Sequence, residues 1–424
     1  MASVTEKLLV LDSSFCMEAI RQRGLEDSVT CRDLRGFFSH VWSVHPFASL
    51  VAVDHRTAKY GKPDWHALTE IHTFIDGKMG RFRFLSGLPP LNFLISQAGI
   101  LAMLAGLVRR EGISVIRAGD PLYLGLLGWA LARLCRIPFV VRVGGNHDKV
   151  YASTRRPVQP RLFGSRRVEK IVERFVLSRA DLVAGANEDN LNFALANGAT
   201  PARSTLFRYG NLIDRRHFLP PAERGDAGQM LAEASVAPGR FLLYVGRLES
   251  VKHPEDVVRV LADVRRRGHD VKALLVGDGS LRSSLMEIAR EHGVESQVVL
   301  AGNRNQEWLS KVIPVAGVVV SPHTGRALSE AALGAAPIVA YDVDWQAEVV
   351  KTGQTGELVP YKDWKGLADG AVRMLSDTAY AFRMGETARK QVLQMMSPEA
   401  LDSHEREQYA KLLQSFRARF GKVE

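Results

Sequence analysis

Short runs of aliphatic and β-branched residues alternate with helix-like segments along most of the chain, and this alternation constrains the fold more than any other feature. Strands and helices in such alternation are typical of parallel sheets with crossover helices. In the first half, the pattern predicts strands at 7–12, 38–43, 114–117, 139–143 and 181–184, and helices at 91–110, 120–135 and 165–178.

The second half repeats the pattern more regularly. Strands are predicted at 241–245, 271–276, 298–301, 317–320 and 338–341, each before a helix. Most of these runs are almost wholly apolar, as expected of strands covered on both faces. Ligands of such doubly wound domains bind beyond the carboxyl ends of the strands, so the loops after these strands should carry the chemistry.

At 424 residues the chain is too long for one ordinary core, and two domains are expected. The stretch 207–221 ends in a proline pair, and the polar, glycine-containing segment 223–229 follows it, so the interdomain link is placed there. The expected division is 1–218, 219–396, and a charged helix over 397–424 that crosses back to brace the first domain.

Cysteine usage and the N-terminus indicate a reducing compartment. The three cysteines are scattered and odd in number, which argues against a disulfide framework. The first residues, MASVTEKLLVLDSS, lack the basic region, long apolar run and cleavage site of a signal peptide. A cytoplasmic location is therefore expected.

The formal net charge of +10 suits a nucleic acid, an anionic membrane or a phosphorylated ligand. The densest cationic cluster has no aromatic interleaving and no nucleic-acid-binding motif, so no nucleic acid is expected. The segment 155–174 is either a solvated loop with a basic helix face or a contact with an anionic membrane. Its cations are Arg155, Arg156, Arg161, Arg166, Arg167, Lys170 and Arg174.

One apolar stretch, 91–108, barely reaches the roughly 18–20 residues needed to span a bilayer, and it contains Asn92, Ser96 and Gln97. A buried core helix is the favoured interpretation. A membrane span and a helix lying partly in the membrane interface are the alternatives.

Two loops of the second half carry residues suited to a phosphorylated ligand. Arg247 and Lys252 follow the strand at 241–245 and either neutralise a departing diphosphate or are ordinary surface cations. Gly277 and Asp278 follow the next strand, with Gly279 after them, where glycine permits either close ligand approach or an ordinary tight turn. The chain contains no dinucleotide-binding GxGxxG.

The loop 322–326 precedes a helix expected to begin near 325–327. The free N–H groups and positive dipole end of such a helix suit phosphate oxygens. Glu330 falls one turn into this helix, where its carboxylate either accepts two ribose hydroxyls or interacts favourably with the helix dipole. Asp344 is predicted to cap the following helix, and the Asp342–Asp344 pair is not expected to bind a metal.

Taken in order, these segments resemble the large group 1 family of retaining glycosyltransferases, the family 4-like enzymes with the GT-B fold. The resemblance rests on Gly246-Arg247 with Lys252, Gly277-Asp278-Gly279, and Glu330-Ala331-Ala332 with Pro337-Ile338-Val339-Ala340. It begins earlier, with Ala180-Asp181-Leu182-Val183-Ala184 and Gly210-Asn211-Leu212-Ile213-Asp214, Phe218 and Pro220. It covers about 170–400 and implies two doubly wound Rossmann-like domains facing each other across a cleft.

The resemblance also implies roles for individual residues. Arg247 and Lys252 would hold the nucleotide diphosphate and stabilise the departing charge, and Glu330 would contact the ribose. His147 would face the reacting sugar, although a structural histidine is an equal alternative. The other residues implied to bind the donor are Gly277, Asp278, Asn303, Arg304, His323, Thr324, Gly325, Arg326, Ala327 and Leu328.

One position departs from the family pattern. The family signature has two glutamates, and Glu330 matches the later one. The earlier one, eight residues before it, normally contacts the donor sugar, and Pro322 stands there in this chain. Either His323, Thr324 or Arg326 contacts the donor sugar instead, or the donor differs from the common ones.

The resulting hypothesis is a cytoplasmic, metal-independent hexosyltransferase that needs no cofactor. It would move a sugar from a nucleotide sugar to a glycan or lipid-linked acceptor, in glycan, polysaccharide or glycolipid biosynthesis, and would contact the inner face of an anionic membrane through 155–174. A sugar-nucleotide epimerase of the same fold and a non-catalytic nucleic-acid-binding protein are the alternatives.

Overall fold

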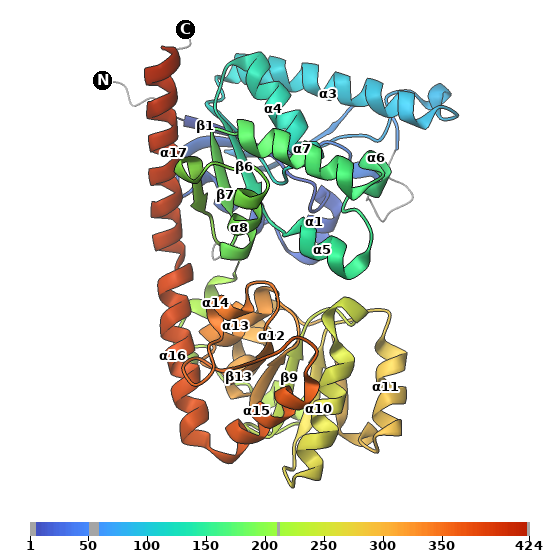
Figure 1. Ribbon diagram of the computed structural model, residues 1–424, viewed down its shortest axis with the longest axis vertical. Coiled ribbons are helices and arrows are strands. Elements are labelled where there is room, and N and C mark those ends of the chain that lie inside the picture. The colour runs from blue at the N-terminus through green and yellow to red at the C-terminus, as the bar shows by residue number, and fades with distance from the viewer. Residues whose placement is uncertain (1–5, 51–58, 210–212, 422–424) are drawn as a thin grey trace. The chain divides into compact units, whose positions relative to one another are not determined.

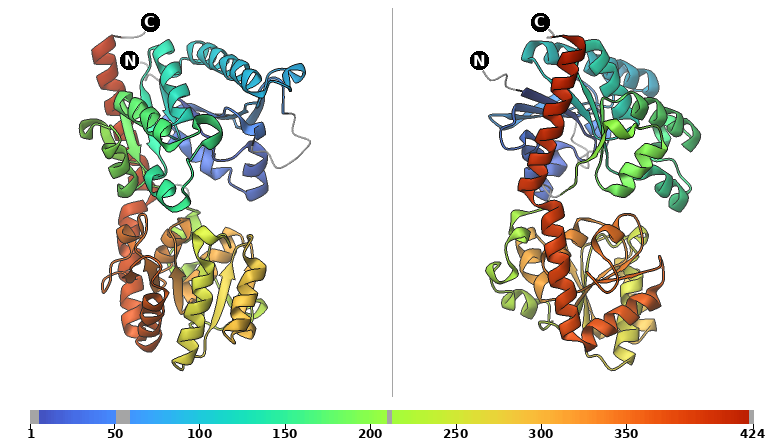
Figure 2. Two further views of the ribbon diagram at one scale, coloured as in Figure 1. Left: turned by 45° about the vertical axis from the view of Figure 1, so that its right-hand side comes forward. Right: turned by 60° about the vertical axis from the view of Figure 1, so that its left-hand side comes forward.

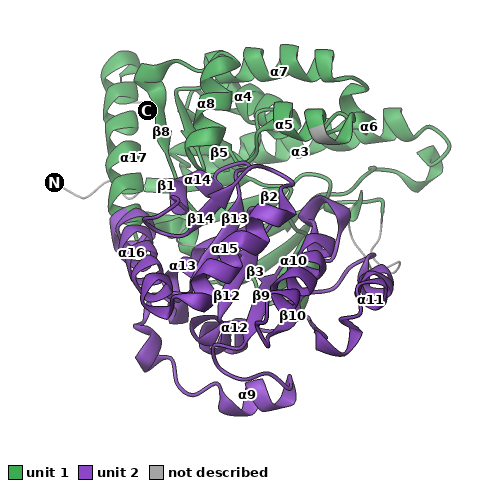
Figure 3. Ribbon diagram, turned by 60° about the horizontal axis from the view of Figure 1, so that its bottom comes forward, with its two compact units in different colours: residues 1–212, 401–424 green, residues 213–400 purple. Residues whose placement is uncertain are grey.

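The computed structural model describes residues 6–50, 59–209 and 213–421 (Figure 1). The chain divides into two compact units, residues 1–212 with 401–424 and residues 213–400, which Figure 3 colours separately. The boundary falls inside the predicted link at 207–221, six residues before the expected division after residue 218. Gly210, Asn211 and Leu212 of the family-like motif lie outside the described residues.

The described part of unit 1 contains an eight-stranded sheet in the order β3-β4-β2-β1-β5-β6-β7-β8. All neighbours are parallel except β3 and β4, which form an antiparallel edge pair that the sequence pattern did not predict. The strands are β1 (Glu6–Leu11), β2 (Phe38–His45), β3 (Asp64–Thr69), β4 (His72–Asp76), β5 (Val115–Ala118), β6 (Phe139–Val143), β7 (Leu182–Gly185) and β8 (Ser204–Leu206).

Helices cover both faces of this sheet, and β1 shows why. Leu9 and Leu11 pack into one core with residues of α3, α4 and α7, whereas Leu8 and Val10 pack into another with residues of α17. Successive side chains of a strand point to opposite faces, so an uninterrupted apolar run requires cover on both sides. The helices are α1 (Met17–Arg23), α2 (Asp27–Thr30), α3 (Pro89–Glu111), α4 (Tyr123–Cys135), α5 (His147–Thr154), α6 (Pro160–Phe163), α7 (Arg166–Arg179) and α8 (Glu188–Ala196).

The C-terminal helix α17 (Pro398–Phe420) supplies the cover of the second face, and from Leu401 onward it belongs to unit 1. Its Tyr409 is fully buried, and its ring lies edge-on to Phe38 with centroids 5.1 Å apart. Nε of Arg406 donates a hydrogen bond of 2.7 Å to the carbonyl oxygen of Leu34. The last helix is therefore part of the core of unit 1.

The described part of unit 2 contains a six-stranded parallel sheet in the order β11-β10-β9-β12-β13-β14. Its strands are β9 (Phe241–Val245), β10 (Lys272–Val276), β11 (Val298–Gly302), β12 (Val318–Ser321), β13 (Ile338–Tyr341) and β14 (Glu357–Val359). Its helices are α9 (Gly228–Glu233), α10 (Pro254–Arg266), α11 (Arg282–Glu291), α12 (Gln306–Val312), α13 (Arg326–Leu333), α14 (Gln346–Val349), α15 (Trp364–Ser376) and α16 (Thr378–Met396). This is the doubly wound domain that the sequence predicts (Figure 2).

Each sheet has a point where the strand order reverses direction. In unit 2 the reversal lies between β9 and β12, and in unit 1 it lies between β1 and β5. The helices after such neighbouring strands leave toward opposite faces, which opens a crevice at the carboxyl ends of the strands. A ligand site of unit 2 is therefore expected at the loops after β9 and β12.

Candidate functional site

The loop after β9 carries the two cations predicted to bind a diphosphate. Arg247 is exposed, and its carbonyl oxygen accepts a hydrogen bond of 2.8 Å from the hydroxyl of Tyr244, which anchors the loop. Lys252 ends the short 3-10 helix Ser250–Lys252 that follows. Within the part of the chain that is described, neither side chain forms an ion pair with a carboxylate.

Lys252 joins this loop to the loop after β12. Its Nζ donates a hydrogen bond of 2.6 Å to the carbonyl oxygen of Thr324 and lies 3.2 Å from Nδ1 of His323. Burial, followed by the nearby charge of Arg247, lowers the pKa of Lys252 to about 8, against a weaker opposing effect of Asp344. Two cations close enough to disfavour each other form a site that an anion would stabilise.

The helix α13 begins at the same place. Its N-cap, Gly325, has an extended backbone and no side chain to accept from the first N–H groups, and Arg326 and Ala327 form the start of the first turn. Leu328 donates its N–H back to the carbonyl of Gly325 at 3.1 Å. The remaining N–H groups and the positive end of the helix dipole suit phosphate oxygens. Since Thr324 is bound by Lys252, this helix start lies beside the lysine.

Glu330 lies one turn further along α13 and is almost completely buried. Nε of Arg326 lies 3.0 Å from its Oε1 as an ion pair, yet Oε1 receives no properly directed hydrogen bond among the described groups. A buried carboxylate oxygen with unused acceptor capacity favours a hydrogen-bond donor from a ligand, such as a ribose hydroxyl.

The turn at Gly277 and Asp278 has a structural cause. Gly277 has φ +134°, and a Cβ there would lie 1.9 Å from the carbonyl oxygen of Gly246, so only glycine fits. The N–H of Leu248 donates to the carbonyl oxygen of Asp278 at 3.0 Å. The glycine thus allows the loops after β9 and β10 to pack directly on each other, which is the ordinary-turn alternative left open by the sequence.

Asn303 and Arg304 follow β11 and are both exposed. The guanidinium of Arg304 lies over the ring of Trp308, 5.4 Å from its centroid. The carbonyl oxygen of Gly302, just before them, accepts the N–H of Gly277 at 2.9 Å. Hydrogen bonds thus connect the loops after β9, β10 and β11 in series, and Lys252 connects them to the loop after β12.

The prediction that Asp344 caps the next helix is wrong. The helix α14 begins at Gln346 with Trp345 at its N-cap and no capping side chain, and Asp344 has φ +52°. Its Oδ2 lies instead 3.8 Å from Nε2 of His323.

The sequence reasoning also missed Gln346, which is fully buried. Its side-chain amide bonds the backbone and the hydroxyl of Ser321 and so holds the end of β12 in place.

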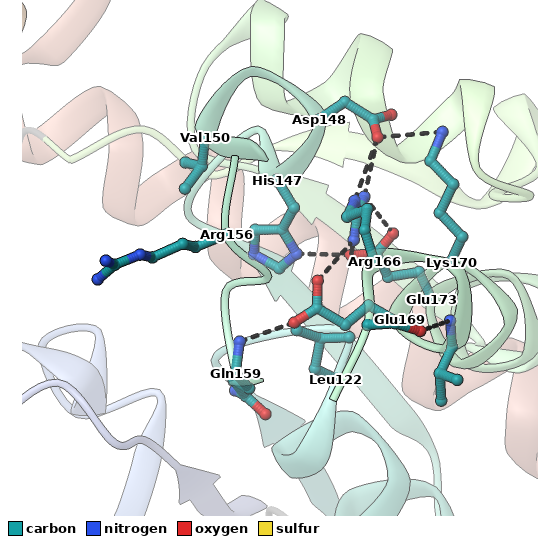
Figure 4. A network of polar contacts seen from close by, with 12 residues as sticks. Leu122, His147, Asp148, Val150, Arg156, Gln159, Arg166, Glu169, Lys170 and Glu173 are labelled. Atoms are coloured by element: carbon teal, nitrogen blue, oxygen red, sulfur yellow. Dashed lines mark hydrogen bonds and ion pairs between the residues drawn. The ribbon is translucent and has the colours of Figure 1, made fainter. Parts of the chain in front are cut away.

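In unit 1, His147 is the first residue of α5 and sits in a buried polar network (Figure 4). Its Nδ1 lies 2.7 Å from Oε1 of Glu173, which is fully buried. Both oxygens of Glu173 also accept hydrogen bonds from Arg166, at 2.6 and 2.8 Å. An ionised carboxylate only accepts hydrogen bonds, so Nδ1 of His147 carries the proton. Its Nε2 forms no hydrogen bond with the described residues.

Arg166 was grouped with the surface cations of 155–174, and the structure corrects that prediction. Its side chain is buried and bonds Glu169 and Glu173 from its own helix as well as Asp148. Burial disfavours its charge, but the hydrogen bonds and charge of Glu173 outweigh burial and raise the pKa of the guanidinium. Lys170, although exposed, is paired with Asp148 at 3.0 Å. The basic surface of this segment is therefore smaller than the sequence suggests.

The strand-order reversal of unit 1 carries carboxylates rather than free cations. Asp12 follows β1 and forms an ion pair with Arg32, which holds the pKa of Asp12 well below its usual range despite burial. Asp120 follows β5, and burial raises its pKa to about 6. Its Oδ1 accepts the N–H of Leu122 at 2.7 Å.

A protein-family model matches part of unit 2. Residues 232–391 match the model described as "Glycosyl transferases group 1". The match lies within unit 2 and covers less than half of the chain, so it shows that unit 2 is similar to the group 1 glycosyltransferases. The matched segment contains β9 to β13 and every candidate residue of unit 2 from Arg247 to Glu330.

Curated relatives match parts of the chain. It is 31% identical over 209 residues to the D-inositol 3-phosphate glycosyltransferase of Nocardia farcinica, covering 45% of this chain and 46% of that protein. It is 30% identical over 152 residues to the alpha-D-kanosaminyltransferase of Streptomyces kanamyceticus, covering 35% of this chain and 39% of the relative. The chain thus matches less than half the length of both relatives.

Solved structures are similar to nearly the whole chain. The sucrose-phosphate synthase of Thermosynechococcus elongatus gives a TM-score of 0.73 at 18% identity, covering 97% of this chain and all of that one. The Anabaena protein HepE in complex with UDP gives 0.71 at 17% identity, covering 96% of this chain and all of HepE. At such identities the likeness shows the fold, which is GT-B with two Rossmann-like units.

Proposed function

We propose that the chain is a retaining, metal-independent hexosyltransferase that moves a sugar from a nucleotide diphosphate to an acceptor hydroxyl. The observation that carries the proposal is the junction of the loops after β9 and β12. Arg247 and Lys252 lie there, and neither forms an ion pair with a carboxylate of the described residues. Lys252 also bonds the loop that leads into the uncapped start of α13.

The chemistry needs charge neutralisation at the leaving phosphate more than it needs a strong nucleophile. Arg247 and Lys252 would bind the diphosphate oxygens and stabilise the charge that develops as the sugar leaves. The first N–H groups of α13, from Arg326 to Leu328, would bind the same phosphates. These groups supply the positive charge that a metal supplies in other transferases, which is the basis for proposing metal independence.

The rest of the donor would extend from this junction along the connected loops. Oε1 of Glu330, which accepts no hydrogen bond from the described residues, would accept the ribose hydroxyls. Asn303 with Arg304 would lie along the base. His323, Thr324 or Arg326 would contact the sugar in place of the family glutamate that Pro322 replaces. Because the similar protein HepE is described with UDP and with UDP-glucose, a uridine donor is the first to test.

In unit 1, His147 would face the reacting sugar with Nε2 as a hydrogen-bond acceptor, since Glu173 holds the proton on Nδ1. The acceptor would be a glycan or a lipid-linked sugar in glycan, polysaccharide or glycolipid biosynthesis. We further propose a cytoplasmic enzyme that contacts the inner face of the membrane.

A thermal-shift panel tests the donor site. The purified chain, Arg247→Ala and Glu330→Ala are heated with UDP-, GDP-, ADP- and dTDP-linked sugars. A ligand at about a hundred times its Kd stabilises a protein by roughly 2.7 kcal/mol. We expect one nucleotide class to stabilise the wild type and to lose its effect in both variants. Stabilisation by none of the four would contradict the proposal.

Product analysis separates transfer from epimerisation. With the stabilising nucleotide sugar and no acceptor, a transferase leaves the donor sugar unchanged in configuration, whereas an epimerase converts it. Appearance of an epimeric nucleotide sugar under these conditions would overturn the transferase proposal.

A further inference from the structure

The first half of α3 buries its polar side chains inside unit 1 and exposes apolar side chains. Asn92 is almost fully buried, and its Oδ1 accepts the N–H groups of Arg81 and Phe82 at 2.7 and 3.0 Å. Its Nδ2 donates to the carbonyl oxygen of Phe82 at 2.6 Å. One asparagine thus fixes the preceding turn onto the helix.

Ser96 and Gln97 are buried on the same side. Oγ of Ser96 donates to the carbonyl oxygen of Lys78 at 2.9 Å, and Nε2 of Gln97 donates to that of Pro46 at 3.2 Å. Oε1 of Gln97 accepts the hydroxyl of Tyr123 at 2.6 Å. Every polar group that made this helix look unlike a membrane segment is therefore satisfied inside unit 1.

The outward side of the same segment is apolar. We call the exposed side chains of Phe82, Phe84, Leu88, Leu91 and Leu94 the 82–94 patch. Phe84 is 80% exposed and Leu94 is 64% exposed, and the rings of Phe82 and Phe84 stack with centroids 5.1 Å apart. The segment that carries the patch is the turn before α3 and the start of that helix (Figures 1 and 2). Exposed apolar side chains gathered in this way mark an interaction surface.

The charges around the patch indicate an anionic partner. Residues 77–110 contain no Asp or Glu. Arg83 is exposed within the patch and Arg81 is half-buried beside it. Aromatic and leucine side chains interleaved with arginines fit a bilayer with anionic headgroups, where the rings and leucines enter the acyl boundary and the arginines meet phosphates.

We propose that the 82–94 patch docks unit 1 on the surface of an anionic lipid bilayer. The helix α3 is long and apolar enough to cross a membrane, but 44% of its most apolar window is buried inside the structure. Its hydrogen bonds through Asn92, Ser96 and Gln97 hold it on the sheet. The contact is therefore interfacial and shallow, made by one turn and the first half of α3.

This surface differs from the 155–174 segment, and it refines the proposed membrane contact without depending on transfer activity. Arg166 of that segment is buried in the network of His147, and Lys170 is paired with Asp148. The 82–94 patch has apolar side chains that can insert into a bilayer, and a charged loop alone lacks them.

Vesicle flotation tests the proposal. The full chain is mixed with vesicles of phosphatidylcholine alone or with phosphatidylglycerol added, and the floated fraction is measured. The variants are Phe84→Ser/Leu94→Ser in the patch and Phe382→Ser, whose phenyl ring is 68% exposed in unit 2, as a matched control. We expect the wild type and F382S to float with anionic vesicles, and the patch variant to lose at least about tenfold in vesicle affinity.

Three outcomes would overturn the proposal. One is a wild type that floats with neither vesicle, and another is a patch variant that floats as well as the wild type. The third is a wild-type dimer, seen by light scattering without lipid, that the patch variant converts to a monomer, because the patch would then be a protein interface. A retained thermal shift with the donor nucleotide shows that the variant is folded and keeps the donor result separate.

Discussion

The two units reverse their strand order in the same way, yet the charges at the two reversals differ. In unit 2, Arg247 and Lys252 lie at the reversal, and neither pairs with a carboxylate in the part of the chain that the structure describes. In unit 1, Asp12 at the reversal is paired with Arg32, and the nearby glutamate of the His147 network is held by Arg166.

The charged groups at the two reversals therefore have different expected roles, one in stability and one in ligand binding. Ion pairs that are complete within the fold fix side chains in place and leave nothing for a ligand to neutralise. Burial, and after it the charge of Arg247, lower the pKa of Lys252, and an anion that binds beside both cations would stabilise their charges. Substitutions in both units test this contrast.

The largest effect is expected in unit 1, on stability. Arg166→Ala leaves Glu169 and Glu173 buried without their cation, which should cost about 3–5 kcal/mol of unfolding free energy. Guanidinium unfolding measures it. Arg167→Ala, an exposed neighbour on the same helix, should change stability by less than about 0.5 kcal/mol. Equal effects of the two variants would mean that the network does not hold α7.

In unit 2, removal of a cation at the reversal should lower the transfer rate and leave the unfolding free energy unchanged. Arg247→Ala removes one of two cations that neutralise the leaving diphosphate and should lower the transfer rate roughly 10²–10³-fold. The exposed Lys351, replaced by alanine, is the matched control and should keep the wild-type rate. A lowered unfolding free energy in Arg247→Ala would show that this arginine belongs to the fold instead.

Glu330 is buried like Glu173, but one of its oxygens accepts no hydrogen bond from any described residue. Glu330→Gln should weaken nucleotide diphosphate binding about tenfold, because an amide accepts at one atom only. Calorimetric titration with the nucleotide and its 2′,3′-dideoxy analogue measures the effect. The analogue should bind wild type and variant alike, and an equal loss for both ligands would exclude the ribose as the partner.

The smallest effect is a pH dependence of donor binding. Burial and Arg247 lower the pKa of Lys252 to about 8 in the free protein, and a bound diphosphate would raise it again. Binding should therefore take up protons, and affinity should fall as pH rises through about 8, by at most tenfold per pH unit. Lys252→Arg, which stays charged, should remove this dependence. An unchanged slope in that variant would assign the titration to another group.

The sequence predicted the buried strands well and the edges poorly. The predicted bounds of β6, β9 and β13 coincide with those observed, because each is an apolar run covered on both faces. The pair β3–β4 was missed because β3 is not an apolar run and alternates exposed and half-buried residues. Its antiparallel pairing with β4 depends on contacts formed in the fold. The edge strand β14 was missed because it is only three residues long.

Three features of the sites were missed from the sequence, each for a different reason. Arg166 looked like one surface cation among seven, although Glu169 and Glu173 stand three and seven residues further on the same helix face. Asp344 looked like a cap, but its positive φ removes it from that position. The link from Lys252 to Thr324 joins residues 72 positions apart, which no local pattern shows.

We propose that Arg247 and Lys252, at the strand-order reversal of unit 2, form a diphosphate site. A crystal structure of the chain with UDP, or with whichever nucleotide stabilises it, tests this proposal. We expect the diphosphate in contact with Arg247, Lys252 and the first N–H groups of α13, and the ribose on Glu330. A diphosphate bound elsewhere, with these cations still free of any phosphate, would contradict it.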